Sequence, residues 1–272
     1  MRDNRLLKRI LCLVLLSLTL FCGAMAEQVS FRDINSTDSY VITLEKVKRL
    51  NGERSYEHPG YRVQQGMASD GTWIYTDLES KTTGMGSFWK LSPETWEVAE
   101  TRYDIPVEHC NDLTWNSRLG LLISANTSPH GKLLTFTDPE TMTCFTRELP
   151  FRAYAVAYDE VSDRYMIGQV GTTFVITDGE FNVLSRHQLK NPGLARQGSD
   201  CDDKHIYFVQ NRDDKSEVRI QVYDWDGNFV NQIPVMAYQE IEDMCHIGDD
   251  VYLSFYSNGS YIYKATLERA EK

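Results

Sequence analysis

The feature that most constrains the fold is a repeat of roughly 44 residues that occurs five times along the chain. Similar short segments begin at Gln65, Asn111, Tyr154, Gln197 and Ile241, so successive starts lie 46, 43, 43 and 44 residues apart. Each start is followed by two further runs rich in aromatic and β-branched residues, which is the composition of β-strands. Such a chain buries each unit against the next one, so the period predicts a ring or a stack of similar sheets.

A turn follows the third run in four of the five repeats, at residues 92–95, 138–141, 178–180 and 224–227. These turns contain Pro, Gly and Asp, which respectively preset φ, tolerate positive φ and bond to the nearby backbone. A fourth short run comes next. Four strands in a repeat of this length are typical of a propeller blade, so we predict an all-β, five-bladed β-propeller with four antiparallel strands per blade.

The fifth repeat lacks its turn and its fourth strand, and a spare strand at residues 40–47 precedes the first repeat. A closed ring leaves no open sheet edge. We therefore expect the N-terminal strand to pair beside residues 261–264, so that the propeller domain spans 40–272. Residues 27–39 would form a loosely held leader, and residues 54–60 would lead from the outer strand to the axis. The alternative is an open β-sandwich with accidental periodicity.

The N-terminus has the pattern of a secretory signal at residues 1–26. Four basic residues precede an apolar run at residues 10–21, and Ala24-Met25-Ala26 supplies a cleavage site. The run is shorter than the roughly 20 residues of a membrane span. We expect a secreted protein, extracellular or periplasmic, with no stable membrane insertion after cleavage. A lipoprotein anchor at Cys22 is the alternative, and the bulky Phe21 before it argues against that.

The charge balance excludes one class of partner. The chain has 28 basic and 39 acidic residues, and removal of residues 1–26, with four and one, leaves 24 against 38. An acidic protein without a basic patch repels phosphate backbones, so nucleic-acid binding is not expected.

Four cysteines lie beyond the signal: Cys110, Cys144, Cys201 and Cys245. They could form two disulfides, or they could be small core residues. Cys201 and Cys245 occupy the same position in adjacent repeats, so their side chains should point in the same rotational sense and not meet. We predict that these two do not pair, and Cys110 with Cys144 stays open.

Candidate site residues come from comparing equivalent positions of the repeats. The second position of the recurring segment reads Gly66, Asp112, Ala155, Gly198 and Glu242. We expect Asp112 and Glu242 to face each other across the axis, with the small residues leaving room between them for a ligand. The other polar side chains near these positions are Gln65, His109, Asn111, Arg152, Gln197 and Glu240.

Several chemistries suit this arrangement. Two carboxylates with amides nearby could hold calcium, with Asp112 and Glu242 as ligands. They could also bind sugar hydroxyls, or act as general acid and base in glycoside chemistry. The structural alternative is that buried carboxylates near strand ends accept hydrogen bonds from backbone N–H groups.

The segments at residues 65–70, 109–115 and 134–141 resemble blades of secreted bacterial β-propellers, the broad group with NHL-, YVTN- and gluconolactonase-like repeats. In lactonase-like members an acid and an Asn–Asp pair hold calcium on the axis. Asn111, Asp112 and Glu242 match that pattern, although that family usually has six blades and this chain has five repeats.

Two functions follow as expectations. The first is a secreted binding or scaffold propeller that recognises a glycan, a peptide, a small molecule or a cell-surface polymer at the axial mouth. The alternative is a hydrolase or lyase of sugar or lactone substrates that uses Asp112 and Glu242, with or without calcium.

Overall fold

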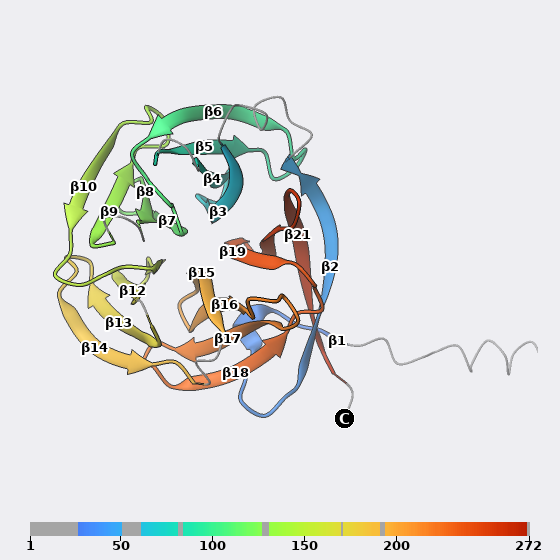
Figure 1. Cartoon of the computed structure of the whole chain (residues 1–272). Helices are drawn as coiled ribbons and strands as arrows, with labels where there is room; N and C mark the ends of the chain where they lie inside the picture. The colour runs from blue at the N-terminus through green and yellow to red at the C-terminus, as the bar shows by residue number, and fades with distance from the viewer. Residues whose placement is uncertain are drawn as a thin grey trace, which may run out of the picture.

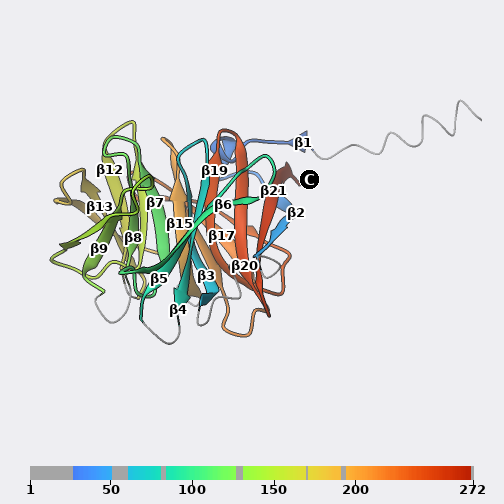
Figure 2. The ribbon, with the colours of Figure 1, turned by 90° about the horizontal axis from the view of Figure 1, so that it is seen from above.

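The computed structural model describes residues 27–50, 61–80, 84–126, 131–169, 171–190 and 194–270. The predicted signal at residues 1–26 and the predicted connection at residues 54–60 lie outside these ranges. Five twisted sheets surround a central axis, as Figure 1 shows from one end and Figure 2 from the side. No helix in the described ranges is long and apolar enough to cross a membrane.

The five blades each have four antiparallel strands that run from the axis to the rim, which confirms the predicted five-bladed propeller. Blade one comprises β3 (Tyr61–Ser69), β4 (Ile74–Ser80), β5 (Gly86–Leu91) and β6 (Val98–Ile105). Blade two comprises β7 (Asp112–Asn116), β8 (Leu121–Ala125), β9 (Leu133–Thr137) and β10 (Cys144–Glu148). Blade three comprises β11 (Ala155–Asp159), β12 (Arg164–Gly168), β13 (Thr173–Asp178) and β14 (Val183–Gln188). Blade four comprises β15 (Ala195–Cys201), β16 (His205–Asn211), β17 (Val218–Asp224) and β18 (Phe229–Pro234). Blade five comprises β19 (Glu240–Ile247), β20 (Asp250–Tyr256), β21 (Ser260–Arg269) and the N-terminal β2 (Tyr40–Arg49).

The ring closes through β2, as the sequence predicts. This strand pairs antiparallel with β21, from Tyr40 opposite Arg269 to Arg49 opposite Tyr261. Exposure alternates along its first residues, because Ile42 packs into the core between blades four and five while Val41 faces solvent. The closure therefore joins the two ends of the chain and also fills the last gap between blades.

The leader is ordered by its contacts, so the expectation of a loosely held segment is wrong. Its β1 (Glu27–Gln28) pairs with the end of β21, and a 3₁₀ turn, η1 (Phe31–Asp33), follows. Phe31 and Ile34 are each only 4% exposed and belong to the core of blades four and five. We call residues 27–39 the strap.

The predicted turns join the third and fourth strands of their blades. The Oδ1 atom of Asp138 accepts the backbone N–H groups of Glu140 and Thr141, and Asp178 and Asp224 bind their own turns in the same way. This bonding explains why Asp recurs in the repeats: its carboxylate replaces backbone partners that the reversing chain loses.

Three of the five inner strands contain bulges, which the repeat alignment does not reveal. The register shifts in β3 between Gln64 and Met67, in β15 between Arg196 and Ser199, and in β19 between Ile241 and Asp243. A bulge of one residue exchanges the two faces of a strand from that point on. The residues of blade five beyond the bulge are therefore displaced by one from their predicted positions.

All four cysteines within the described ranges are free thiols, and the prediction that Cys201 and Cys245 do not pair is confirmed. The two side chains point in opposite rotational senses, however, and not in the same sense as predicted, because the bulge displaces the inner strand of blade five by one residue. Cys201 packs against the core between blades three and four, whereas Cys245 packs between blades five and one. Cys110 and Cys144, left open above, share the core between blades one and two without a disulfide.

The closure can be tested with two adjacent residues of β2. We predict that Ile42→Ala will lower the free energy of unfolding by about 2–5 kcal/mol, because it removes buried atoms from the core between blades four and five. Val41→Ala, at a 42% exposed position of the same strand, should change it by less than about 0.5 kcal/mol. Urea unfolding followed by tryptophan fluorescence measures both. Equal effects would mean that β2 does not pack as the fourth strand of blade five.

Candidate functional site

Two carboxylates at the centre of the ring hold the inner strands together. Asp112 accepts the N–H of Leu113 at 2.9 Å and, from the next blade, the N–H of Val156 at 2.6 Å. Asp243 accepts the N–H of Met244 at 2.8 Å and, from the next blade, that of Met67 at 2.6 Å. Identical bonding shows that Asp243 is the counterpart of Asp112. The prediction that Glu242 faces Asp112 is therefore corrected, and the bulge in β19 is the physical reason.

The axis is filled at this level. Ser199 in blade four donates to Asp112 at 2.6 Å, and we call Asp112, Ser199 and Asp243 the axial clasp. A Cβ atom at Gly198 would overlap the Asp243 carboxylate, and one at Gly66 would lie 2.7 Å from Leu113 Cβ. These glycines thus allow close approach of neighbouring strands, and they do not keep space for a ligand as the sequence suggested.

The two acids of the clasp share a proton. Burial raises the pKa of Asp112 to about 7, against the opposing effect of hydrogen bonds from Ser199 and Asp243. Burial and the charge of Asp112 raise the pKa of Asp243 well above its usual range. Two adjacent carboxylates in a dry site cannot both ionise at low cost, so Asp243 retains the proton and donates it to Asp112.

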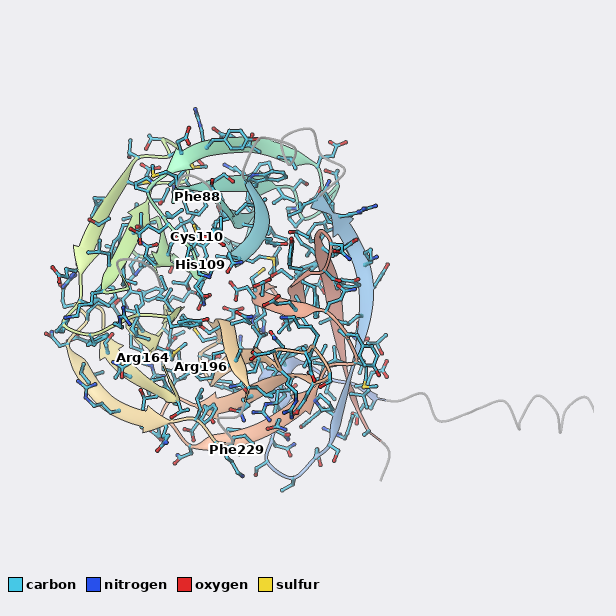
Figure 3. All side chains as sticks on the ribbon, viewed as in Figure 1. Phe88, His109, Cys110, Arg164, Arg196 and Phe229 are labelled. Atoms are coloured by element: carbon cyan, nitrogen blue, oxygen red, sulfur yellow. The ribbon has the colours of Figure 1, made fainter. Side chains whose placement is uncertain are left out.

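The other predicted residues lie at the end of the axis where the inner strands begin, which we call the lower face. Figure 3 shows His109 near the centre of the ring. His109 pairs with Glu79 at 3.1 Å, and Asn111 donates to the carbonyl of Tyr154 at 2.9 Å. Gln197 donates to Glu240 at 3.2 Å.

These lower-face contacts mostly join one blade to the next. Gln65 donates to the carbonyl of Gln64, and Arg152 is exposed. Glu242 is 3% exposed, and its charge adds to burial, the main cause, in raising the pKa of Tyr154. Within the described ranges, no three His, Cys, Asp or Glu side chains are grouped so that they could hold a metal ion. Both oxygens of Asp112 already accept protein hydrogen bonds, so a calcium ion expected there would have to compete with these bonds.

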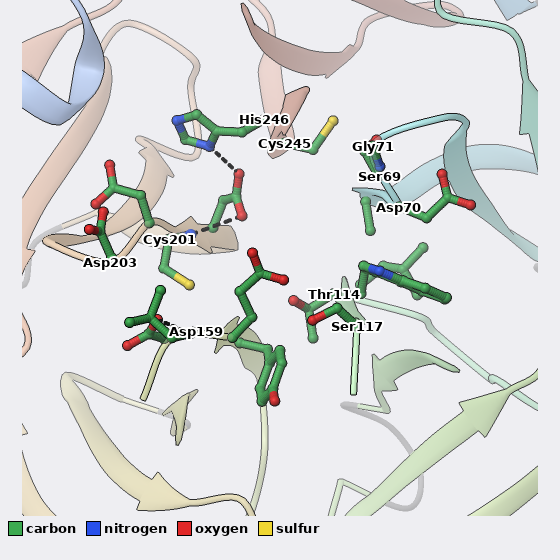
Figure 4. A pocket seen from close by; sticks show the side chains of 18 of the residues that line it. Ser69, Asp70, Gly71, Thr114, Ser117, Asp159, Cys201, Asp203, Cys245 and His246 are labelled. Atoms are coloured by element: carbon green, nitrogen blue, oxygen red, sulfur yellow. Dashed lines mark hydrogen bonds and ion pairs between the residues drawn. The ribbon is translucent and has the colours of Figure 1, made fainter. Parts of the chain in front are cut away.

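A pocket of about 380 Å³ opens at the opposite, upper face, where the inner strands end (Figure 4). None of the eight predicted site residues lines it. Every blade contributes to its wall, through residues 68–71, 113–115 and 117, 158–161, 200–203 and 245–246, and the strap adds Arg32. Each of these segments is the end of an inner strand or the start of the loop after it. The concavity therefore forms where the ends of the five inner strands meet around the axis.

The pocket is strongly acidic. Its carboxylates are Asp70, Asp159, Glu160, Asp200, Asp202 and Asp203. Its two basic side chains are Arg32 and His246, and each already pairs with a carboxylate: Arg32 with Asp203 at 2.5 Å and His246 with Asp200 at 2.5 Å. The lining therefore keeps a net negative charge even with both basic groups protonated.

Three of these acids are fixed by the loops they belong to. Asp70 accepts the N–H groups of Thr72 and Trp73, and Asp202 accepts those of Lys204 and His205. Asp159 similarly accepts the N–H of Val161. The repeat pattern contains this signal, since Asp70, Asn116, Asp159 and Asp202 all stand at the sixth position of the recurring segment. Sequence reasoning missed that these turns meet around one pocket.

The neighbouring Asp200 favours the imidazolium form of His246. Burial lowers its pKa, but the charge of Asp200 and their hydrogen bond outweigh burial, so the pKa lies above its usual value. Its ring also meets the rings of Phe31 and Tyr207 at 6.1 and 5.3 Å between centroids. His246 thereby connects the pocket wall to the strap.

The shared proton of the clasp predicts a specific pH dependence. Asp243→Asn should lower the free energy of unfolding by about 1–3 kcal/mol at pH 5, and this deficit should shrink toward pH 8. The unfolded carboxyl groups ionise near pH 4, whereas in the folded protein Asp112 ionises only near pH 7 and the pKa of Asp243 is also well above its usual value. Wild-type stability from this pair is thus full below about pH 4 and falls as pH rises, by at most about 1.4 kcal/mol per pH unit for each of the two carboxyl groups, and Asp243→Asn removes one of these contributions.

Urea unfolding of both proteins from pH 5 to 8 measures the deficit. Titrations that occur in both proteins cancel in the difference between the two curves. An unchanged deficit over this range would show that the pair does not share a proton.

No protein family profile matches the sequence, and no curated protein sequence matches it. Among solved structures, a chain of a nidogen/laminin complex is similar with a TM-score of 0.50 and 11% identity, covering 80% of this chain and 86% of that one. A luciferin-regenerating enzyme also has a TM-score of 0.50 and 11% identity, covering 83% and 95%. At this identity the likeness shows a β-propeller fold and nothing further.

Proposed function

We propose that the protein is an exported binding propeller whose ligand enters the acidic pocket of the upper face and carries positive charge. The observation that carries this proposal is the pocket itself: six carboxylates line about 380 Å³, and within the described ranges only three of them pair with a basic side chain, Asp203 with Arg32, Asp200 with His246 and Asp159 with Arg164. A concave site with low-dielectric walls concentrates the field of its charges, so it attracts cations from solution.

The lining favours a peptide or a basic polymer segment among the ligands expected from the sequence. Glu160 is exposed at the pocket, where it can meet an ammonium or guanidinium group. Trp115 and Tyr158 add aromatic surface, which attracts the same groups through cation–π contacts. An anionic glycan would be repelled by this lining. Export rests on the basic start, apolar run and cleavage site of residues 1–26.

The hydrolase or lyase alternative receives less support. It requires substrate to reach Asp112, which has no exposed surface, and a partner carboxylate at Glu242. The clasp acids instead bond to backbone N–H groups, the structural role weighed above as the alternative to a ligand site.

The proposal predicts that Glu160→Lys will weaken binding of a fluorescein-labelled tetralysine peptide by about tenfold or more, because it places a like charge in the pocket. Fluorescence anisotropy in low-salt buffer measures the affinity. Glu94→Lys makes the same change at an exposed turn outside the pocket and should leave binding within about twofold.

Three outcomes decide the matter. Selective loss with Glu160→Lys supports the pocket. Equal loss with both variants would mean that the peptide binds the acidic surface at large. If the wild-type protein binds neutral glycans on an array and not tetralysine, the ligand is not cationic and the charge argument is wrong.

A further inference from the structure

The strap reaches from the closing strand to the acidic pocket and places one cation on its wall. Its first two residues, β1, pair with β21, and the η1 turn then lies across blades four and five. Arg32, the middle residue of η1, lines the pocket and pairs with Asp203 at 2.5 Å. An arginine side chain thus already occupies part of the site for which we propose a cationic ligand.

Other contacts of the strap hold its backbone without help from Arg32. Phe31 is buried, and its carbonyl accepts a hydrogen bond from Tyr207 at 3.1 Å. Asn231 donates to the carbonyls of Asn35 at 2.6 Å and Asp38 at 3.0 Å. The strap is therefore anchored by its apolar side chain and by backbone bonds, while the Arg32 side chain extends from a fixed base.

The ion pair itself is open to exchange. The Arg32 side chain is 47% exposed and that of Asp203 is 33% exposed. Pairs in such surroundings are screened by water and contribute little to stability, so a second cation can replace the first at small cost. Replacement needs only rotation of the arginine side chain, because Phe31 stays in the core.

We propose that Arg32 is a tethered competitor for the pocket, and that the ligand is a peptide whose arginine side chain binds Asp203 in its place. This inference rests on the proposed function of the pocket. Asp203 offers a carboxylate that a guanidinium binds with two parallel hydrogen bonds, a geometry that an ammonium cannot match. The strap thereby sets a threshold: only ligands that bring their own cation to Asp203 bind fully.

The test uses a fluorescein-labelled tetra-arginine peptide and fluorescence anisotropy on four proteins besides the wild type: Arg32→Gln, Asp203→Asn, the double variant and Arg102→Gln. Arg102→Gln is the matched control, since Arg102 is likewise exposed and ion-paired, with Glu100 on the outer strand of blade one. It removes the same charge away from the pocket. Thermal melts of all five proteins check that folding is intact.

Arg32→Gln should tighten binding about two- to fivefold relative to Arg102→Gln, which corresponds to about 0.4–1 kcal/mol. Asp203→Asn should weaken binding, and in that background Arg32→Gln should have no further effect. If the wild type binds and Arg32→Gln binds equally or more weakly than the control, Arg32 does not compete, although the pocket proposal survives. If none of the proteins binds the peptide, the pocket proposal fails and this inference falls with it.

Discussion

The structure depends on how five inner strands converge on one axis without leaving buried backbone groups unpaired. Asp112 and Asp243 solve this by accepting the N–H of the next blade's inner strand, with Ser199 donating across the axis. Each carboxylate thus joins two blades, which in the described part of the chain are separate sheets and have no ladder of backbone hydrogen bonds between them. An unpaired buried N–H costs about 1–3 kcal/mol, so these bonds decide the relative positions of the strands.

That solution also decides where a ligand can bind. The clasp fills the middle of the axis, and below it the polar side chains bind one another between blades, as in the pairs Gln197–Glu240 and Asn111–Tyr154. Above it the loops diverge, and the turn-fixing aspartates surround a pocket. The acidity of that pocket is therefore partly a consequence of turn chemistry, because the residues that stabilise the loops also set the field inside it.

The N-terminal segment has two roles that a single stretch of chain can combine. Its β2 closes the ring, which requires only alternating burial along a strand. The strap, which directly precedes β2, places Arg32 on the wall of the pocket. Ring closure and occupancy of the pocket are thus coupled through one anchor, Phe31, which packs against both the core and the wall residue His246.

The sequence by itself determined the number of blades, the strands within them and the strand that closes the ring. These follow from local signals: a period of roughly 44 residues, turn residues at fixed places, and one spare strand for one missing strand. Only the tertiary structure decided which acid faces Asp112, because one bulged residue in β19 exchanges the faces of the strand and puts Asp243 where the pattern places Glu242. It also decided which end of the axis is open, since polar residues stand at both ends of every inner strand and their bonding partners come from other blades. The docking of Phe31 and Arg32 was equally hidden, because a short segment has no periodicity and its position depends on surfaces formed by blades four and five.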